Sequence, residues 1–81
     1  MTDCALRKNI VGLRVASARA AHQPALTQDA LSGRLAKVGL SLDRAAIAKI
    51  ETGRRYVLDY ELRALAKVLD VRTDWLLGDR K

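Results

Sequence analysis

Residues 44–52 place side chains that could hydrogen bond to a polyanion along one side of an expected helix. Projecting these residues at about 100° per residue separates two faces. One face is apolar and holds Ala46, Ile47 and Ile50. The opposite face is slim and basic, with small residues between longer ones: Arg44, Ala45, Ala48, Lys49 and Thr52. A helix of this shape fits close to the floor of a nucleic-acid groove, although any amphipathic surface helix shows two such faces.

Three residues suited to phosphate contact follow this segment. Arg54, Arg55 and Tyr56 come directly after Gly53, which can end the helix by adopting a positive φ. Residues 1–55 hold ten basic and four acidic side chains, whereas residues 56–81 hold five of each, so the net charge of +6 lies N-terminally. Clustered cations favour a polyanionic partner, but a net charge of this size also increases solubility. The position of the cations on the fold must therefore distinguish polyanion binding from solubility.

The chain offers little for catalysis or metal binding. Its one histidine, His22, has no second imidazole or cysteine partner and no nucleophile motif beside it. Its one cysteine, Cys4, excludes an intrachain disulfide and a thiol zinc cluster. We therefore expect no enzyme activity, no cofactor and no bound metal, and we expect a reducing, cytoplasmic compartment.

The N-terminal region does not read as a targeting segment. Residues 1–21 superficially resemble a secretory signal, but Arg14 interrupts the apolar run and Arg19 follows it. A transit peptide would suit the basic composition, yet its removal would also remove a helix that the fold needs. No stretch approaches the ~20 apolar residues of a membrane span, so we expect no membrane association.

The elements that must position these side chains are helices. The chain has 81 residues, enough for one small domain, and it contains thirteen Ala, thirteen Leu and no Phe. Ala and Leu rank highest in helix propensity. We expect an all-α compact bundle of about five helices near 10–21, 28–38, 44–52, 59–69 and 73–77, between a flexible N-terminus at 1–9 and a charged tail at 78–81.

Capping residues and apolar stripes support these boundaries. Good N-caps precede or open four of the helices: Asn9, Thr27, Asp43 and Asp59. Apolar residues recur at helical spacing in three of them: Val11, Val15 and Ala18; Leu31, Leu35 and Val38; Leu58, Leu62, Leu65, Ala66 and Leu69. The outer face of the fourth helix is charge-mixed and expected to be solvated: Glu61, Arg63, Ala64 and Lys67.

Three motifs in order carry a family resemblance. They are the Thr-Gln that opens the second helix, the Ile-x-x-Ile-Glu-x-Gly that closes the third, and the Leu-Ala-Lys-Val-Leu-x-Val of the fourth. Together they resemble the Cro and lambda-repressor (XRE) type of helix-turn-helix domain over residues 10–77. The resemblance implies that the third helix enters the DNA major groove.

The resemblance also implies roles for individual residues. Base edges would be read by Arg44, Ala45, Ala48 and Lys49. Phosphates would be contacted by Thr27, Gln28, Thr52, Arg54, Arg55 and Tyr56. Arg19 and Glu51 would form a structural ion pair that does not touch DNA. The projection of residues 44–52 selects the same outward face independently.

The chain departs from the family pattern at two places. It is two residues longer between Arg19 and Gln28, and five residues longer between Leu35 and Ile47. The second insertion is expected to lengthen the second helix and the turn after it. It leaves open which side chains of the third helix reach bases.

The expected function is sequence-specific binding of double-stranded DNA by a small prokaryotic or phage transcriptional regulator of repressor type. A homodimer is expected because one helix reads few base pairs, and the last helix with Trp75 is the expected contact. The alternative is a protein-interaction module on the same fold, antitoxin-like or an adaptor, that uses Trp75, Leu76 and Leu77.

Overall fold

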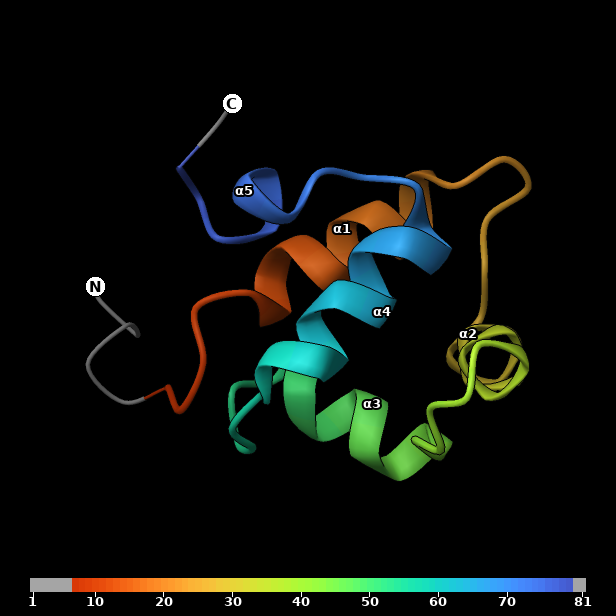
Figure 1. Cartoon of the computed structure of the whole chain (residues 1–81), viewed down its shortest axis with the longest axis horizontal. Helices are drawn as coiled ribbons and strands as arrows, with labels where there is room; N and C mark the ends of the chain where they lie inside the picture. Colours follow the sequence, from red (N-terminus) through yellow and green to blue (C-terminus); the bar gives the residue numbers. More distant parts are fainter. Residues whose placement is uncertain (1–6, 80–81) are drawn as a thin grey trace.

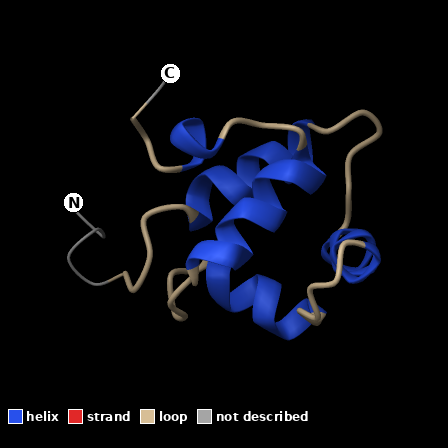
Figure 2. Cartoon of the chain, in the orientation of Figure 1, coloured by secondary structure: helices blue, strands red, loops and turns tan. Residues whose placement is uncertain are grey.

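Five helices and their connections make up residues 7–79, the part of the chain that the computed structural model describes. The helices are α1 (Gly12–Ala21), α2 (Gln28–Lys37), α3 (Arg44–Glu51), α4 (Asp59–Leu69) and α5 (Thr73–Leu76). Figure 2 shows that this part of the chain contains helices and loops and no strand. The expected all-α bundle of about five helices is therefore confirmed.

One core holds the helices together. α3 packs against α1 and α2, while α4 packs against α1, α2 and α5. In the view of Figure 1, α4 crosses the middle of the picture, with α1 above it and α3 below it, and α1 and α3 also pack directly against each other. The largest fully buried side chains come from all five helices: Val15, Leu31, Leu35, Ile47, Ile50, Leu65 and Leu76. The burial of these side chains is the main stabilising contribution to the fold.

The capping residues act largely as expected. Thr27 accepts a hydrogen bond from the N–H of Ala30 at 3.0 Å, and Asp43 accepts one from the N–H of Ala46 at 2.8 Å. Gly39 has a φ of 88° after the end of α2, a conformation that glycine adopts without steric cost. Asn9 caps α1 from further out, because its Oδ1 accepts the N–H of Gly12 at 2.8 Å and the helix begins at Gly12 rather than Ile10.

The start of α4 differs from expectation. Its N-cap is Leu58, not Asp59, and the carboxylate of Glu61 accepts the backbone N–H of Leu58 at 3.0 Å. Glu61 is 3% exposed, so the expectation of a solvated Glu61 is wrong. Leu58 and Val38, both expected on core stripes, are 48% and 45% exposed because they lie at the N-cap of α4 and the C-cap of α2.

The connection between α2 and α3 runs over residues 38–43 and is held to the core. Leu42 is 5% exposed, and its carbonyl accepts a hydrogen bond from the hydroxyl of Ser32 at 2.7 Å. Leu40 is partly buried against the same core. The insertion expected between Leu35 and Ile47 thus includes a connection that packs on the core through Leu40 and Leu42 and leads directly into the start of α3.

Parts of the expected flexible N-terminus (1–9) and charged tail (78–81) belong to the folded domain. Residues 1–6, which include Cys4, and residues 80–81 lie outside the described part. Residues 7–9 belong to the folded domain, because Asn9 is buried and the N–H of Lys8 donates to the carbonyl of Gly53 at 2.8 Å. Asp79 likewise donates its N–H to the carbonyl of Asp74 at 2.9 Å.

Candidate nucleic-acid interface

The third helix presents one face to the core and one to solvent. Ile47 and Ile50 are fully buried. On the opposite side Arg44, Ala45 and Lys49 are exposed, and Ala48 between them is partly buried. The protein's own side chains leave this outer face of α3 accessible. The face is slim, because alanines lie between its two cations, Arg44 and Lys49.

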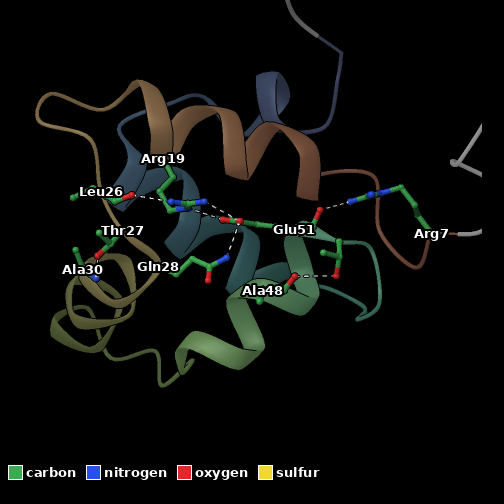
Figure 3. Close-up of polar contacts among 9 residues, drawn as sticks. Arg7, Arg19, Leu26, Thr27, Gln28, Ala30, Ala48 and Glu51 are labelled. Atoms are coloured by element: carbon green, nitrogen blue, oxygen red, sulfur yellow. Dashed lines mark hydrogen bonds and ion pairs between the residues drawn. The ribbon is translucent and has the colours of Figure 1, made fainter.

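A carboxylate at the C-terminal end of α3 ties three helices together (Figure 3). Glu51 accepts hydrogen bonds from Arg19 of α1, with Nε 2.8 Å from Oε2 and Nη2 3.0 Å from Oε1. Gln28 of α2 donates its Nε2 to Oε1 of Glu51 at 3.0 Å. An acidic residue is disfavoured by the dipole at a helix C-terminus, so these three donors offset an unfavourable position while they fix α3 relative to α1 and α2.

Arg19 also holds the segment that leads into α2. Its Nη1 donates to the carbonyl of Leu26 at 2.9 Å, so its guanidinium bridges Glu51 and the entry to α2. The hydrogen bond to Glu51 raises the pKa of Arg19, which stays charged. The ion pair expected between Arg19 and Glu51 is thus present, and Gln28, expected at a phosphate, donates to the same carboxylate.

The segment before α1 binds the C-terminal end of α3. Arg7 donates Nη2 to the carbonyl of Glu51 at 2.8 Å (Figure 3). Asn9 donates Nδ2 to the carbonyls of Ile50 at 3.0 Å and Arg55 at 2.8 Å. The last carbonyls of a helix have no partner within it, and here side chains from another part of the chain supply that partner.

Two glycines make this close approach possible. A Cβ on Gly12 would collide with the carbonyl oxygen of Ile50, and a Cβ on Gly53 would lie 2.8 Å from the side chain of Arg7. Gly53 also has a φ of 77°, in the left-handed region. From the sequence, Gly53 was expected only to end the helix. The role of Arg7 was not expected, because Arg7 lies outside the helices and no apolar periodicity indicates its partner.

The side chains after α3 differ in exposure and in hydrogen bonding. Arg54 and Tyr56 are exposed, and the ammonium of Lys8 lies 5.6 Å from the centre of the Tyr56 ring. Arg55 instead forms a bidentate pair with Glu61, with Nη1–Oε1 at 2.8 Å and Nη2–Oε2 at 2.9 Å. The guanidinium of Arg55, expected to contact a phosphate, therefore forms an ion pair at the start of α4 within the fold.

The Arg55–Glu61 pair shifts the ionisation of both partners. Hydrogen bonding to Arg55, followed by that to the backbone of Leu58, lowers the pKa of Glu61 from its ordinary value of 4.5 against the opposing effect of burial. The same hydrogen bond raises the pKa of Arg55. An incomplete capping box, with Glu at the third helical position but no Ser or Thr at the cap, was the available sequence signal for Glu61.

A cleft of about 370 Å³ lies where the N-terminal ends of α2 and α3 approach each other. It is lined by Arg19, Thr27, Gln28, Asp29 and Arg44. Across it, Nη1 of Arg44 lies 3.8 Å from Oδ2 of Asp29, with both side chains about 70% exposed. A pair this exposed contributes at most about 1 kcal/mol, so Arg44 remains available to a ligand.

The two expected threonine contacts lie at the ends of the helices. Thr27 is exposed, although its hydroxyl oxygen already caps α2. Thr52 is exposed and donates its hydroxyl to the carbonyl of Ala48 at 2.9 Å. Both residues are exposed, and both hydroxyl groups have a hydrogen-bond partner within the protein.

The alternative surface at the C-terminus is largely used by the fold. Leu76 is fully buried, and Trp75 and Leu77 are partly buried. The guanidinium of Arg14 lies 4.8 Å from the centre of the Trp75 ring, and its Nη1 donates to the carbonyl of Trp75 at 2.8 Å. Arg14 and Trp75 thereby fasten α5 to α1.

The described residues supply no donor set for a metal site. Between residues 7 and 79, no three His, Cys, Asp or Glu side chains gather closely enough to hold a metal ion. In that same part of the chain, the helices are too short and too polar to cross a bilayer.

The fold and this surface define a small five-helix, all-α protein with an exposed basic helix. Comparison of the chain with protein-family models, with curated proteins and with solved structures finds no match.

Proposed function

We propose that this protein binds double-stranded DNA sequence-specifically and acts as a small transcriptional regulator of prokaryotic or phage type, with α2 and α3 as its helix-turn-helix. The observation that carries the proposal is the outer face of α3. Arg44 and Lys49 flank Ala45 on an uncovered helix that the core and the Glu51 network hold rigidly. A recognition helix needs this combination of a slim surface and a fixed orientation.

Arg44 is the proposed reader of a base pair. An exposed guanidinium at the first position of α3 can donate two parallel hydrogen bonds to O6 and N7 of guanine, the commonest specific contact in the major groove. A cation at a helix N-terminus opposes the helix dipole, and the exposed pair with Asp29 offsets this only in part, so an anionic or hydrogen-bond-accepting ligand would favour the position. Lys49 extends the same face.

Phosphate contacts are proposed for the accessible polar side chains around α3. Thr52, Arg54 and Tyr56 are exposed after the C-terminal end of α3, and Thr27 is exposed at the N-cap of α2. Such contacts set register and supply affinity without reading sequence. Arg55 and Gln28 would act indirectly, because each is hydrogen bonded to a carboxylate that positions a helix.

Selection from a random double-stranded DNA pool tests the proposal. We expect enrichment of a short motif containing at least one guanine whose selection depends on Arg44. The matched control is Arg63→Ala, which removes an exposed arginine from α4. A pool that stays random after repeated rounds at low salt would refute sequence-specific binding.

The alternative function is a protein-interaction module that uses Trp75, Leu76 and Leu77. The packing of these three residues weighs against the alternative. A docking surface needs accessible side chains, and the side chain of Leu76 is fully buried. Recovery of a stoichiometric protein partner by a chain that fails to bind DNA, with loss of that partner in Trp75→Ala, would favour this alternative.

A further inference from the structure

A cleft of about 590 Å³ lies between the C-terminal ends of α1 and α4, beside α5. In the view of Figure 1, these two helix ends lie in the upper half of the molecule and α3 lies at the bottom. The cleft shares no residue with the polar cleft beside Arg44, and none of the proposed DNA contacts lines it. Its volume falls within the range of about 300–1,000 Å³ that is typical of small-molecule sites.

The lining of this cleft suits a ligand that is partly apolar. Ala18 and Leu69 are buried, and Val71 and Trp75 are partly buried. Small-molecule sites combine such a surface with a few polar groups that fix the orientation of the ligand. Asp70 is one of these polar groups, and no Glu, Lys or Arg of the described residues lines the cleft. The lining therefore carries a single acidic side chain beside an apolar surface.

Asp70 occupies an unusual position at the end of α4. It is the C-cap of the helix, with a φ of 58° and a ψ of 46° in the left-handed region. Among the described residues it is the one residue other than glycine with a positive φ. A carboxylate at a helix C-terminus is also disfavoured by the helix dipole. Glycine or asparagine would meet the backbone requirement without a charge, so the fold alone does not account for the carboxylate.

No side chain within residues 7–79 neutralises the carboxylate of Asp70. It takes part in none of the ion pairs and side-chain hydrogen bonds of this part of the chain. The cations closest to it in the sequence are placed differently. Arg72 pairs with Asp74 at 3.0 Å, and Lys67 lines a separate cleft together with Arg63. The carboxylate of Asp70 therefore remains available to a ligand.

Other groups at the cleft also favour a positive charge. Both α1 and α4 end here, and the carbonyl end of a helix carries a partial negative charge. His22 donates Nδ1 to the carbonyl of Pro24 at 3.1 Å, so the neutral ring keeps Nε2 as an acceptor. The cations of α1 are engaged, because Arg19 binds a carboxylate and Arg14 donates to the carbonyl of Trp75. The cleft is thus suited to a cation although the whole chain carries +6.

We propose that this cleft binds a small aromatic amine. The ammonium group of the ligand pairs with the carboxylate of Asp70 at the negative ends of α1 and α4. The flat apolar body of the ligand lies against Leu69, Val71 and the ring of Trp75, because aromatic rings pack favourably in offset or edge-to-face contact. A ligand without the charge leaves the carboxylate unpaired, and a ligand without the ring buries little apolar surface.

An NMR titration of the full, isotope-labelled chain without DNA tests the site, with 2-phenylethylamine as the probe. We expect saturable shifts of amide signals within residues 17–23 and 69–75 and of the indole N–H of Trp75, the one tryptophan of the chain, with a Kd below about 1 mM. 2-Phenylethanol replaces the ammonium by a neutral hydroxyl and should bind at least about fivefold more weakly. Butylamine, which lacks the ring, should also bind more weakly.

Asp70→Asn separates the effect of the charge from that of the backbone. Asparagine also adopts the left-handed conformation, so this variant keeps the end of α4 and loses the negative charge. We expect it to weaken the binding of 2-phenylethylamine about three- to fivefold and to leave the binding of 2-phenylethanol unchanged. Asp59→Asn is the matched control, because it removes the same charge from the other end of α4. Thermal unfolding verifies that each variant is folded.

Four results would overturn this proposal: no saturable shift up to about 10 mM probe, shifts on α3 in place of the cleft, equal binding of 2-phenylethanol, or equal weakening by Asp70→Asn and Asp59→Asn. The titration contains no DNA, so its outcome does not depend on the proposed DNA-binding function. A chain that enriches no DNA sequence but binds the amine at Asp70 would keep this site and lose the DNA-binding proposal.

Discussion

At the scale of single residues, the exposed and the engaged arginines have different roles. Arg44 and Arg54 extend into solvent, whereas Arg19 and Arg55 each place a guanidinium on a shielded carboxylate. The carboxylate partners of Arg19 and Arg55 lie at 2.8 Å and are shielded, whereas the one ion pair of Arg44 among the described residues, with the exposed Asp29, spans 3.8 Å. This division determines which substitutions should change DNA binding and which should change stability.

Replacing Arg44 by Ala should relax the preference for one base pair. The lost bidentate contact is worth about 1–3 kcal/mol of discrimination, while folding stability should change little because the side chain is exposed. Competition binding against every single-base variant of the selected site measures the effect. Arg54→Ala should instead weaken binding to all sequences alike, and the reverse pattern would show that the face of α3 is assigned wrongly.

Replacing Glu61 by Gln should destabilise the fold by about 1–3 kcal/mol at pH 7, since Arg55 loses its anionic partner. The pKa of Glu61 is lowered in the folded state, so its contribution is complete above pH 4.5 and is lost as the pH falls from 4.5 through the folded-state pKa. The variant should therefore lose less stability on acidification than the wild type does.

Urea unfolding between pH 7 and pH 3 measures this difference. Asp59→Asn is the control, because Asp59 lies in the same first turn of α4 but is exposed. If the free energies of unfolding of the wild type and of Glu61→Gln fall equally as the pH is lowered, Glu61 does not contribute to the pH dependence.

At the scale of elements, α3 depends on contacts at its C-terminal end as well as on its apolar face. With eight residues, it is too short to be stable alone. Ile47 and Ile50 anchor it to the core, and Arg7, Asn9, Arg19 and Gln28 bind its last turn. The orientation of the proposed recognition helix therefore depends in part on Arg7 and Asn9, which lie 44 and 41 positions before the residues of α3 that they contact.

Replacing Asn9 by Ala should lower the free energy of unfolding by about 2–3 kcal/mol, because the buried amide hydrogen bonds to the carbonyls of Ile50 and Arg55 and to the N–H of Gly12, and only the Ile50 carbonyl keeps another donor, the N–H of Gly53. Thermal and urea unfolding measure the change. Ser17→Ala, at an exposed position of α1, should change stability by less than about 0.5 kcal/mol. Equal effects of the two substitutions would contradict the role assigned to the segment before α1.

At the scale of the whole molecule, the charge distribution predicts the salt dependence of DNA binding. If each chain contacts about three to five phosphates, log K should fall with log salt at a slope of about −3 to −4.5, near −0.9 per phosphate. Fluorescence anisotropy between 50 and 300 mM salt measures the slope. Arg54→Ala should reduce it by about one, and a flat dependence would contradict the proposed phosphate contacts.

The sequence by itself determined the helices and most of their boundaries. Local chemistry decides these features: Thr27 and Asp43 cap through their own side chains, Gly39 and Gly53 end helices through a positive φ, and apolar periodicity shows which face is buried. It also predicted the outward face of α3, because that face depends only on spacing within eight residues. The Arg19–Glu51 pair followed from resemblance to a known family rather than from local pattern.

Only the tertiary structure decided which polar groups meet. Arg55 is paired with Glu61, Gln28 with Glu51, and Asn9 with the last carbonyls of α3. It also decided that Trp75 is partly buried beside Arg14 while Ile10 and Leu13 stay exposed. Helical periodicity describes one helix at a time, whereas these contacts depend on how separate helices are oriented around a shared core, and a charged side chain takes whichever partner that orientation brings within reach.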